Sequence, residues 1–309
     1  MKYPIYKTQI DQLKSTNTGR KYIRSICGKK GNPNKHIEEI FELSSQPNTS
    51  QEASIGRLVL QENHWVDNAS PVIFFDSKSL AKSLYKAKFD FENNFNVAPP
   101  FKTFSISFAP NTVINDVEVK TALISIMTVK EFSEMYKEPL TINGSSQIDP
   151  DELCITVNCD RSTKTKGQHW INSFFAYLPD YSETIKKTHL TNLPSQGSEE
   201  LRIITKIALS LCVYHSATDL KKLIDGYPKS ALSLPKDKNK VSYTASVLHS
   251  SQKTKTGKSE RKVNHRIPHY RNLRAKRFYQ NKYKNMRPGT RWVFVKEVDP
   301  NGSMNTLLT

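Results

Sequence analysis

The chain has 309 residues, 37% of them hydrophobic, and a formal net charge of +17, which suits a globular body with a smaller appendage. It contains no run of 18 apolar residues and no apolar stretch near its first residues, so we expect neither a membrane span nor a secretory signal. Four cysteines without zinc-binding spacing predict reduced thiols in a cytosolic protein, with no metal and no cofactor. They are Cys27, Cys154, Cys159 and Cys212.

The first half of the chain predicts helices mixed with strands. Helical periodicity favours helices at about 35–43, 50–62 and 79–92, and a β-branched and aromatic run predicts a strand at 71–76. Alternation along 101–108 would place Phe104, Ile106 and Phe108 on one face of a strand and Thr103, Ser105 and Ser107 on the other. Further strands are expected at 121–129, 153–159 and 170–178. These elements predict an α+β fold, with a mixed or antiparallel sheet and helices on one side.

The strongest helix signal spans 198–215, where apolar residues recur at helical spacing. A short helix is expected at 219–224. The acidic residues Asp149, Asp151 and Glu152 flank a predicted strand and are interpreted as solvated turn residues rather than a metal site.

The positive charge is concentrated towards the C-terminal end. Residues 236–296 contain 18 Lys/Arg and two acidic residues, whereas the remainder of the chain contains 28 Lys/Arg and 27 Asp/Glu. Such a segment attracts polyanions and is typical of nucleic-acid binding. A basic tail that only confers solubility is the alternative, but the interleaved aromatic residues favour binding.

These patterns divide the chain into three parts. Residues 1–230 form an α+β body that is expected to recognise a peptide or protein. Residues 231–262 form a Lys/Ser/Thr-rich linker or arm. Residues 263–309 form a basic, aromatic segment that binds nucleic acid and includes a strand at 291–298, with Trp292 and Phe294 on one face.

The candidate binding residues surround the motif at 265–274. Arginine can donate two hydrogen bonds to a phosphate, and aromatic rings can stack on unpaired bases, so RNA is the expected partner. The residues predicted to bind nucleic acid are Arg266, His269, Tyr270, Arg271, Arg274, Lys276, Arg277, Tyr279, Tyr283 and Arg291. The nearby Lys282 and Lys284 add to the same charge.

Two histidines in this motif raise the possibility of catalysis. His265 and His269 could act as acid and base in metal-independent RNA cleavage, because imidazole changes charge near neutral pH. Structural roles for both are the alternative, and the sequence does not decide whether the two rings meet.

The motif His265-Arg266-Ile267-Pro268-His269-Tyr270-Arg271, the strand at 291–298 and the upstream segment Leu209-Ser210-Leu211-Cys212-Val213 resemble a phage and mobile-element family. The characterised branch of that family is the type V-A anti-CRISPR inhibitor of Cas-effector biogenesis. The resemblance covers roughly the last 110 residues. It implies recognition of the effector nuclease's N-terminal peptide during translation, followed by loss of the encoding mRNA.

Three hypotheses follow. The first is an anti-CRISPR-like regulator that recognises a nascent polypeptide, such as a CRISPR effector nuclease, and engages RNA at the ribosome. The second is a ribonuclease that uses His265 and His269. The third is a plain RNA- or DNA-binding protein.

Overall fold

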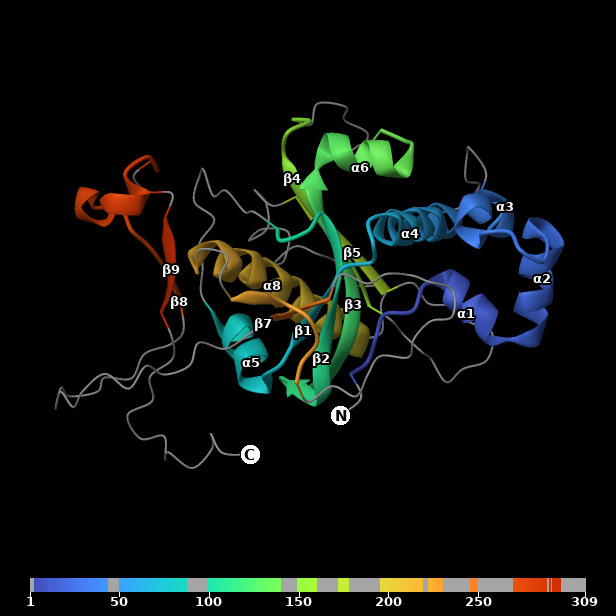
Figure 1. Cartoon of the computed structure of the whole chain (residues 1–309), viewed down its shortest axis with the longest axis horizontal. Coiled ribbons are helices and arrows are strands. Elements are labelled where there is room, and N and C mark those ends of the chain that lie inside the picture. The colour runs from blue at the N-terminus through green and yellow to red at the C-terminus, as the bar shows by residue number, and fades with distance from the viewer. Residues whose placement is uncertain are drawn as a thin grey trace.

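The computed structural model describes residues 3–43, 50–87, 99–139, 149–159, 172–177, 195–218, 222–229, 245–248, 269–287, 289 and 291–295. Two sheets and the helices around them make up this part of the chain (Figure 1). Within it, no helix combines the length and the apolarity that crossing a bilayer requires.

The larger sheet has seven strands in the order β5-β4-β3-β2-β1-β7-β6. The strands are β1 (Val72–Phe75), β2 (Thr103–Ile114), β3 (Val117–Thr128), β4 (Leu153–Cys159), β5 (Asn172–Tyr177), β6 (Leu223–Asp225) and β7 (Ala245–Leu248). β1 is parallel to β2 and β7, and the remaining neighbours are antiparallel. The predicted α+β class with a mixed sheet is therefore confirmed.

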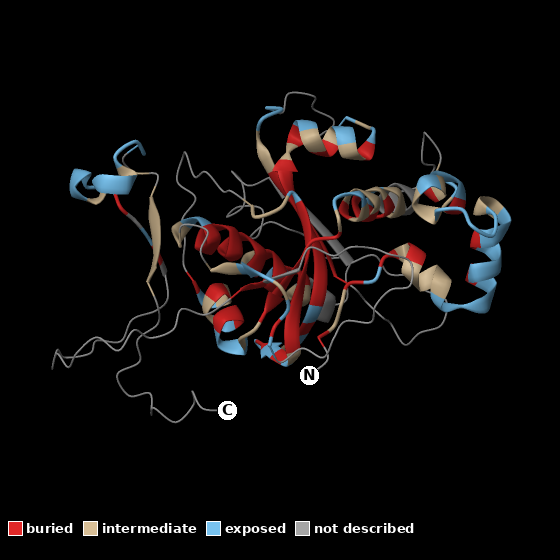
Figure 2. Ribbon diagram, in the orientation of Figure 1, coloured by how far each residue is buried: buried red, intermediate tan, exposed pale blue. Residues whose placement is uncertain are grey.

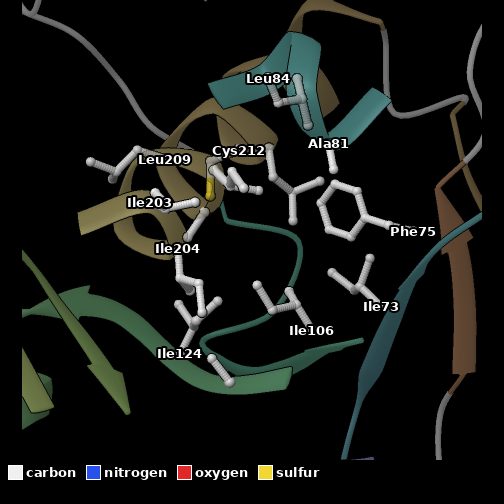
Figure 3. Packing of buried hydrophobic residues seen from close by; sticks show 14 of the residues in the cluster. Ile73, Phe75, Ala81, Leu84, Ile106, Ile124, Ile203, Ile204, Leu209 and Cys212 are labelled. Carbon is white, nitrogen blue, oxygen red and sulfur yellow. The ribbon is translucent and has the colours of Figure 1, made fainter. Parts of the chain in front are cut away.

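One face of this sheet carries the main hydrophobic core, which α5 (Lys78–Lys86) and α8 (Ser195–Ala217) cover. Side chains of β1, β2 and β3 interdigitate with those of the two helices, as Figure 3 shows for Ile73, Ile106 and Ile124 below Ile204 and Cys212. α8 is buried around nearly its whole circumference between Leu201 and His215 (Figure 2). A helix with that burial needs a second covering layer on the side away from the sheet.

The other face of the sheet is covered as well. Trp65 of α4 (Ser50–Asp67) packs there against Phe74 and Leu123, together with Tyr3 and Tyr6 from the N-terminal end of the chain. α6 (Val129–Tyr136) continues directly from β3 and adds Phe132 and Tyr136 to a neighbouring cluster. The prediction of helices on one side only is therefore wrong, because both faces of the sheet are closed to water.

This second layer explains why the polar side of β2 is buried. Phe104, Ile106 and Phe108 point into the main core, as predicted. Thr103, Ser105 and Ser107 point to the other face, and all three are buried. The Ser107 hydroxyl donates a 2.6 Å hydrogen bond to the Pro4 carbonyl oxygen, and the Thr103 hydroxyl pairs with that of Ser125 at 2.9 Å. Hydrogen bonds thus replace water at Thr103 and Ser107, whereas the buried Ser105 hydroxyl has no hydrogen-bond partner among the described residues.

A small helical unit lies beside α4 at the N-terminal end. It consists of α1 (Gln9–Ser15), α2 (Asn17–Cys27), the 3₁₀ turn η1 (Pro33–His36) and α3 (Ile37–Ile40). Ile10, Ile23 and Ile40 form its own core. The sequence pattern predicted only the last of these helices. α1 and α2 each bury a single large hydrophobic side chain, Ile10 and Ile23, which is too few to show a helical period.

Two expectations for the C-terminal third are wrong. Residues 245–248 lie in the predicted linker, yet they form β7, a strand inside the main sheet whose Val247 and Leu248 are buried. Residues 223 and 224 lie at the end of the short helix predicted at 219–224, yet they belong to β6 at the sheet edge. Both runs are four residues or shorter, so pairing with a neighbouring strand decides their conformation.

Candidate nucleic-acid interface

The second sheet is a two-stranded hairpin of β8 (His269–Asn272) and β9 (Trp292–Val295). The strands are antiparallel, with Tyr270 opposite Phe294 and Arg271 opposite Val293. Two 3₁₀ turns, η3 (Lys276–Phe278) and η4 (Asn281–Tyr283), lie in the connection between them. We call residues 269–295 the basic hairpin, since they include eight Lys/Arg and no Asp or Glu.

The basic hairpin is anchored to α8 at Ser210 and Tyr214. The Tyr270 hydroxyl donates a 2.6 Å hydrogen bond to the Ser210 carbonyl oxygen, and both groups are buried. The Phe294 ring meets Tyr214 of α8 edge-on, with ring centroids 5.4 Å apart, and lies 5.0 Å from the Tyr270 ring. Burial raises the pKa of Tyr270 well above its usual range, so this phenol stays a hydrogen-bond donor. The hairpin therefore has a fixed position on the body.

A buried tyrosine organises the connection between the strands. The Tyr279 ring is buried, and its hydroxyl oxygen accepts hydrogen bonds from the backbone N–H of Gly289 at 2.7 Å and of Arg291 at 3.1 Å. The Leu273 side chain is also buried. These contacts tie the turns back to the start of β9.

Arg291 holds the two 3₁₀ turns together. Its guanidinium carbon lies 3.6 Å from the centroid of the Tyr283 ring, and its Nη1 donates a 3.0 Å hydrogen bond to the Phe278 carbonyl oxygen. A planar guanidinium is suited to stacking and hydrogen bonding at once. Arg291 thus connects η3 to η4, and its head group is already occupied within the protein.

The remaining cations of the basic hairpin point to solvent. Seven Lys/Arg side chains are exposed, and the hairpin sequence contains no acidic residue. They are Arg271, Arg274, Lys276, Arg277, Lys282, Lys284 and Arg287. A group of exposed cations on an anchored scaffold produces a local positive potential that attracts polyanions.

The structure changes the roles of several predicted binding residues. Arg271, Arg274, Lys276 and Arg277 are exposed, as phosphate contacts require. Tyr270 and Tyr279 are only 6% and 8% exposed, so their rings cannot act as stacking platforms for bases, and both serve the hairpin's own structure. In the sequence, the alternation of these tyrosines with cations predicted contacts with bases. In the structure, both rings are buried and pack within the protein instead.

Two rings remain partly accessible. Tyr283 and Phe278 are half-buried. The Tyr283 ring has two cations near its centroid, Arg291 at 3.6 Å and Lys282 at 4.6 Å, whereas the Phe278 ring has one, Arg277 at 4.9 Å. The exposed cation Arg287 was missed by the sequence analysis, although its place just before the Pro288-Gly289 turn marks it as a loop-tip residue.

The proposed catalytic pair is not brought together in the described part of the chain. His265 and Arg266 lie outside the described residues, as does the side chain of His269. Ribonuclease chemistry by these histidines therefore stays a prediction.

The other candidate sites have structural explanations. Asp149 accepts a 3.0 Å hydrogen bond from the backbone N–H of Asp151, which is the turn role predicted for this acidic stretch. No group of three or more His, Cys, Asp or Glu side chains that could hold a metal occurs among the described residues. The four cysteines are free thiols, and burial raises the pKa of Cys154 to about 12.

Comparisons with protein-family models, with curated proteins and with solved structures found no match to this chain.

Proposed function

We propose that this protein binds RNA through the exposed cations of the basic hairpin. The observation that carries the proposal is the group of seven exposed Lys/Arg side chains on a hairpin that is anchored to α8 and has no acidic residue. Lysine and arginine side chains supply most of the affinity for a phosphate backbone. The partly accessible ring of Phe278 favours single-stranded or looped RNA, whose bases are free to stack.

We also propose, from the resemblance described above, that RNA binding serves an anti-CRISPR-like regulator of phage origin. In this proposal the body recognises a target polypeptide as it is translated, and the basic hairpin engages the mRNA. The edge strand β6 supports the first part, since its Ile224 is 50% exposed and an extended peptide can pair with a strand at a sheet edge.

The test of RNA binding compares two variants that each lose three positive charges. The first, Arg274→Ala/Lys276→Ala/Arg277→Ala, removes exposed cations of the basic hairpin. The second, Lys78→Ala/Lys82→Ala/Lys86→Ala, removes exposed cations of α5 and is the matched control. Fluorescence anisotropy with a labelled single-stranded RNA should show roughly tenfold weaker binding for the first variant and little change for the second.

The salt dependence gives a second readout of the same binding. If the basic hairpin contacts about six phosphates, the wild-type log–log slope of affinity against salt is about −4 for a single strand. A slope near zero, or equal losses in the two variants, would remove the basic hairpin as the binding site.

The regulatory part needs a translation assay. A labelled mRNA that encodes a CRISPR effector nuclease is incubated with the protein, with and without translating ribosomes. Loss of that transcript only during translation supports the regulator. Cleavage of free RNA supports the ribonuclease instead, and binding without loss leaves a plain RNA-binding protein.

A further inference from the structure

The near-neutral charge of the body hides a second basic region. Residues 12–37 contain seven Lys/Arg and no Asp or Glu. Outside this stretch and residues 236–296, the chain carries 21 Lys/Arg and 27 Asp/Glu. The rest of the body therefore has a net negative charge, which cancels most of the positive charge of residues 12–37 when the net charge of the whole body is calculated.

The fold displays this charge on one helix. In α2, Gly19 and Ile23 are buried against the small core of the N-terminal helical unit. Arg20, Lys21 and Arg24 are exposed on the opposite side of the helix. Arg20 and Arg24 are four residues apart, so they follow one another along the same helix face.

The turn after α2 extends the same surface. Gly28 has a φ of 73°, which ends the helix and lets the chain reverse. Lys29 and Lys30 follow at once, and both are exposed. We call Arg20, Lys21, Arg24, Lys29 and Lys30 the α2 surface.

Three acidic residues of the neighbouring elements, Asp11, Glu38 and Glu39, have partners outside the α2 surface. The Asp11 carboxylate accepts a hydrogen bond from the Thr8 backbone in the capping box of α1. Glu38 of α3 forms an ion pair with Lys137, and Glu39 lies 3.4 Å from His36. Among the described residues, no ion pair joins Lys21, Arg24, Lys29 or Lys30 to an acid. Their charge is available to a partner.

The residues of this helix face favour a phosphate backbone over bases. Beside its cations α2 carries three exposed polar residues, Asn17, Thr18 and Ser25. Asn17 accepts a hydrogen bond from Arg20, and Ser25 donates one to the Tyr22 carbonyl oxygen. Arg, Lys, Ser, Thr and Asn are the side chains that commonly contact phosphates. The only aromatic side chain of the helix, Tyr22, is 36% exposed, and its hydroxyl donates a 3.0 Å hydrogen bond to the Ile40 carbonyl oxygen of α3.

The α2 surface and the basic hairpin lie at opposite ends of the long axis of the molecule (Figure 1). We infer that the α2 surface is a second RNA-binding surface, which grips the phosphate backbone without reading sequence. The inference rests on the proposed function in that the ligand is the same RNA. Two separated contacts on one strand raise the overall affinity through a high effective concentration.

The experiment uses the full chain and the variant Lys21→Ala/Arg24→Ala/Lys29→Ala. Arg20 is left in place because it donates a 2.6 Å hydrogen bond to the Lys14 carbonyl oxygen, which links α2 to α1. The α5 triple variant again serves as the control of equal charge. Circular dichroism and thermal unfolding confirm that each variant is folded before binding is measured.

Binding is measured by anisotropy with a long single-stranded RNA of about 40 nucleotides and with a short one of about 8, which fits a single site. The α2 variant should bind the long RNA roughly tenfold more weakly, and its salt slope should become shallower by about 2. The loss should be smaller for the short RNA, because a short strand can occupy the basic hairpin alone.

The outcomes separate the two proposals. If the hairpin variant loses affinity and the α2 variant matches the α5 control, the inference fails and RNA binding by the hairpin stands. If only the α2 variant loses affinity, the hairpin is not the binding site and the α2 surface is. If α2 captures an acidic protein instead, RNA binding is unchanged in the α2 variant and the inference is equally overturned.

Discussion

The hydroxyl of Tyr270 in β8 donates a 2.6 Å hydrogen bond to the carbonyl oxygen of Ser210 in α8, 60 residues earlier in the chain. This contact joins the basic hairpin to the main core, where Phe294 also packs. The basic hairpin, which carries nine of the ten predicted binding residues, is thus attached through one of its own aromatic side chains.

Removing that hydroxyl should weaken the attachment without emptying the core. Tyr270→Phe keeps the ring and loses one buried hydrogen bond, so the free energy of unfolding should fall by about 1 kcal/mol. Urea denaturation measures the change. Affinity for RNA should be preserved under conditions where the variant is folded. An unchanged unfolding midpoint would show that the hydroxyl contributes nothing to the docking of the hairpin.

Strand β7 should prove essential to the body. Leu248→Ala removes a fully buried side chain beside β1 and should cost about 2–5 kcal/mol of stability. Ile224→Ala on the neighbouring strand β6 is the matched control, because Ile224 is half exposed and its truncation should cost no more than about 0.5 kcal/mol. Similar small effects in both variants would restore the interpretation of 231–262 as a linker.

The position of β7 also changes how truncations should be designed. Ending the chain at residue 230 removes β7 together with the core residues Tyr270 and Phe294. We expect such a truncated chain to lose its cooperative unfolding transition, as calorimetry would show. Point substitutions of exposed cations are therefore the valid test of binding.

Arg291 should matter through its shape more than its charge. Arg291→Lys keeps the positive charge but loses the guanidinium plane over Tyr283 and the forked donor to the Phe278 carbonyl. RNA affinity should fall about threefold because η3 and η4 lose their connection, which is roughly 0.7 kcal/mol. Lys284→Arg, on the exposed surface of the same hairpin, should leave affinity unchanged. Equal behaviour of the two variants would reduce Arg291 to one more surface cation.

The pH dependence of stability should include a contribution from His64. Its Nδ1 lies 3.0 Å from the Thr103 hydroxyl, and burial lowers the pKa of this imidazole below its usual value of 6.5, with Lys102 acting in the same direction and Asp67 and Glu131 opposing. The unfolded chain takes up a proton near pH 6.5 while the folded protein resists it. Stability from this group is therefore complete above about pH 6.5 and declines as the pH falls towards the folded pKa.

His64→Gln should flatten that decline, since glutamine does not titrate. Denaturation midpoints measured from pH 7.5 down to pH 5 test this, and parallel curves for the two proteins would assign the decline to other groups. The comparison uses slopes, so a constant loss of stability in the variant does not obscure it.

The sequence alone predicted those helices and strands in which an apolar pattern repeats over many residues. Apolar spacing along α8 and alternation along β2 predicted both elements. Each element packs against the core along its length, so apolar residues recur in the sequence at the period of a helix or of a strand. The concentration of charge in 236–296 likewise pointed to a polyanion without any knowledge of the fold.

Tertiary structure decided what periodicity does not encode. β6 and β7 are too short to show a pattern, and only pairing with β1 and with each other makes them strands. Tyr270 and Tyr279 resemble base-stacking residues in the sequence, but α8 and the turn around Gly289 bury them. The net charge of the whole body does not reveal the basic face of α2. The face is recognised only from the fold, in which Arg20, Lys21 and Arg24 are exposed on one side of the helix. Burial and direction are properties of packing between distant segments, so a linear sequence records them only where a regular period reveals them.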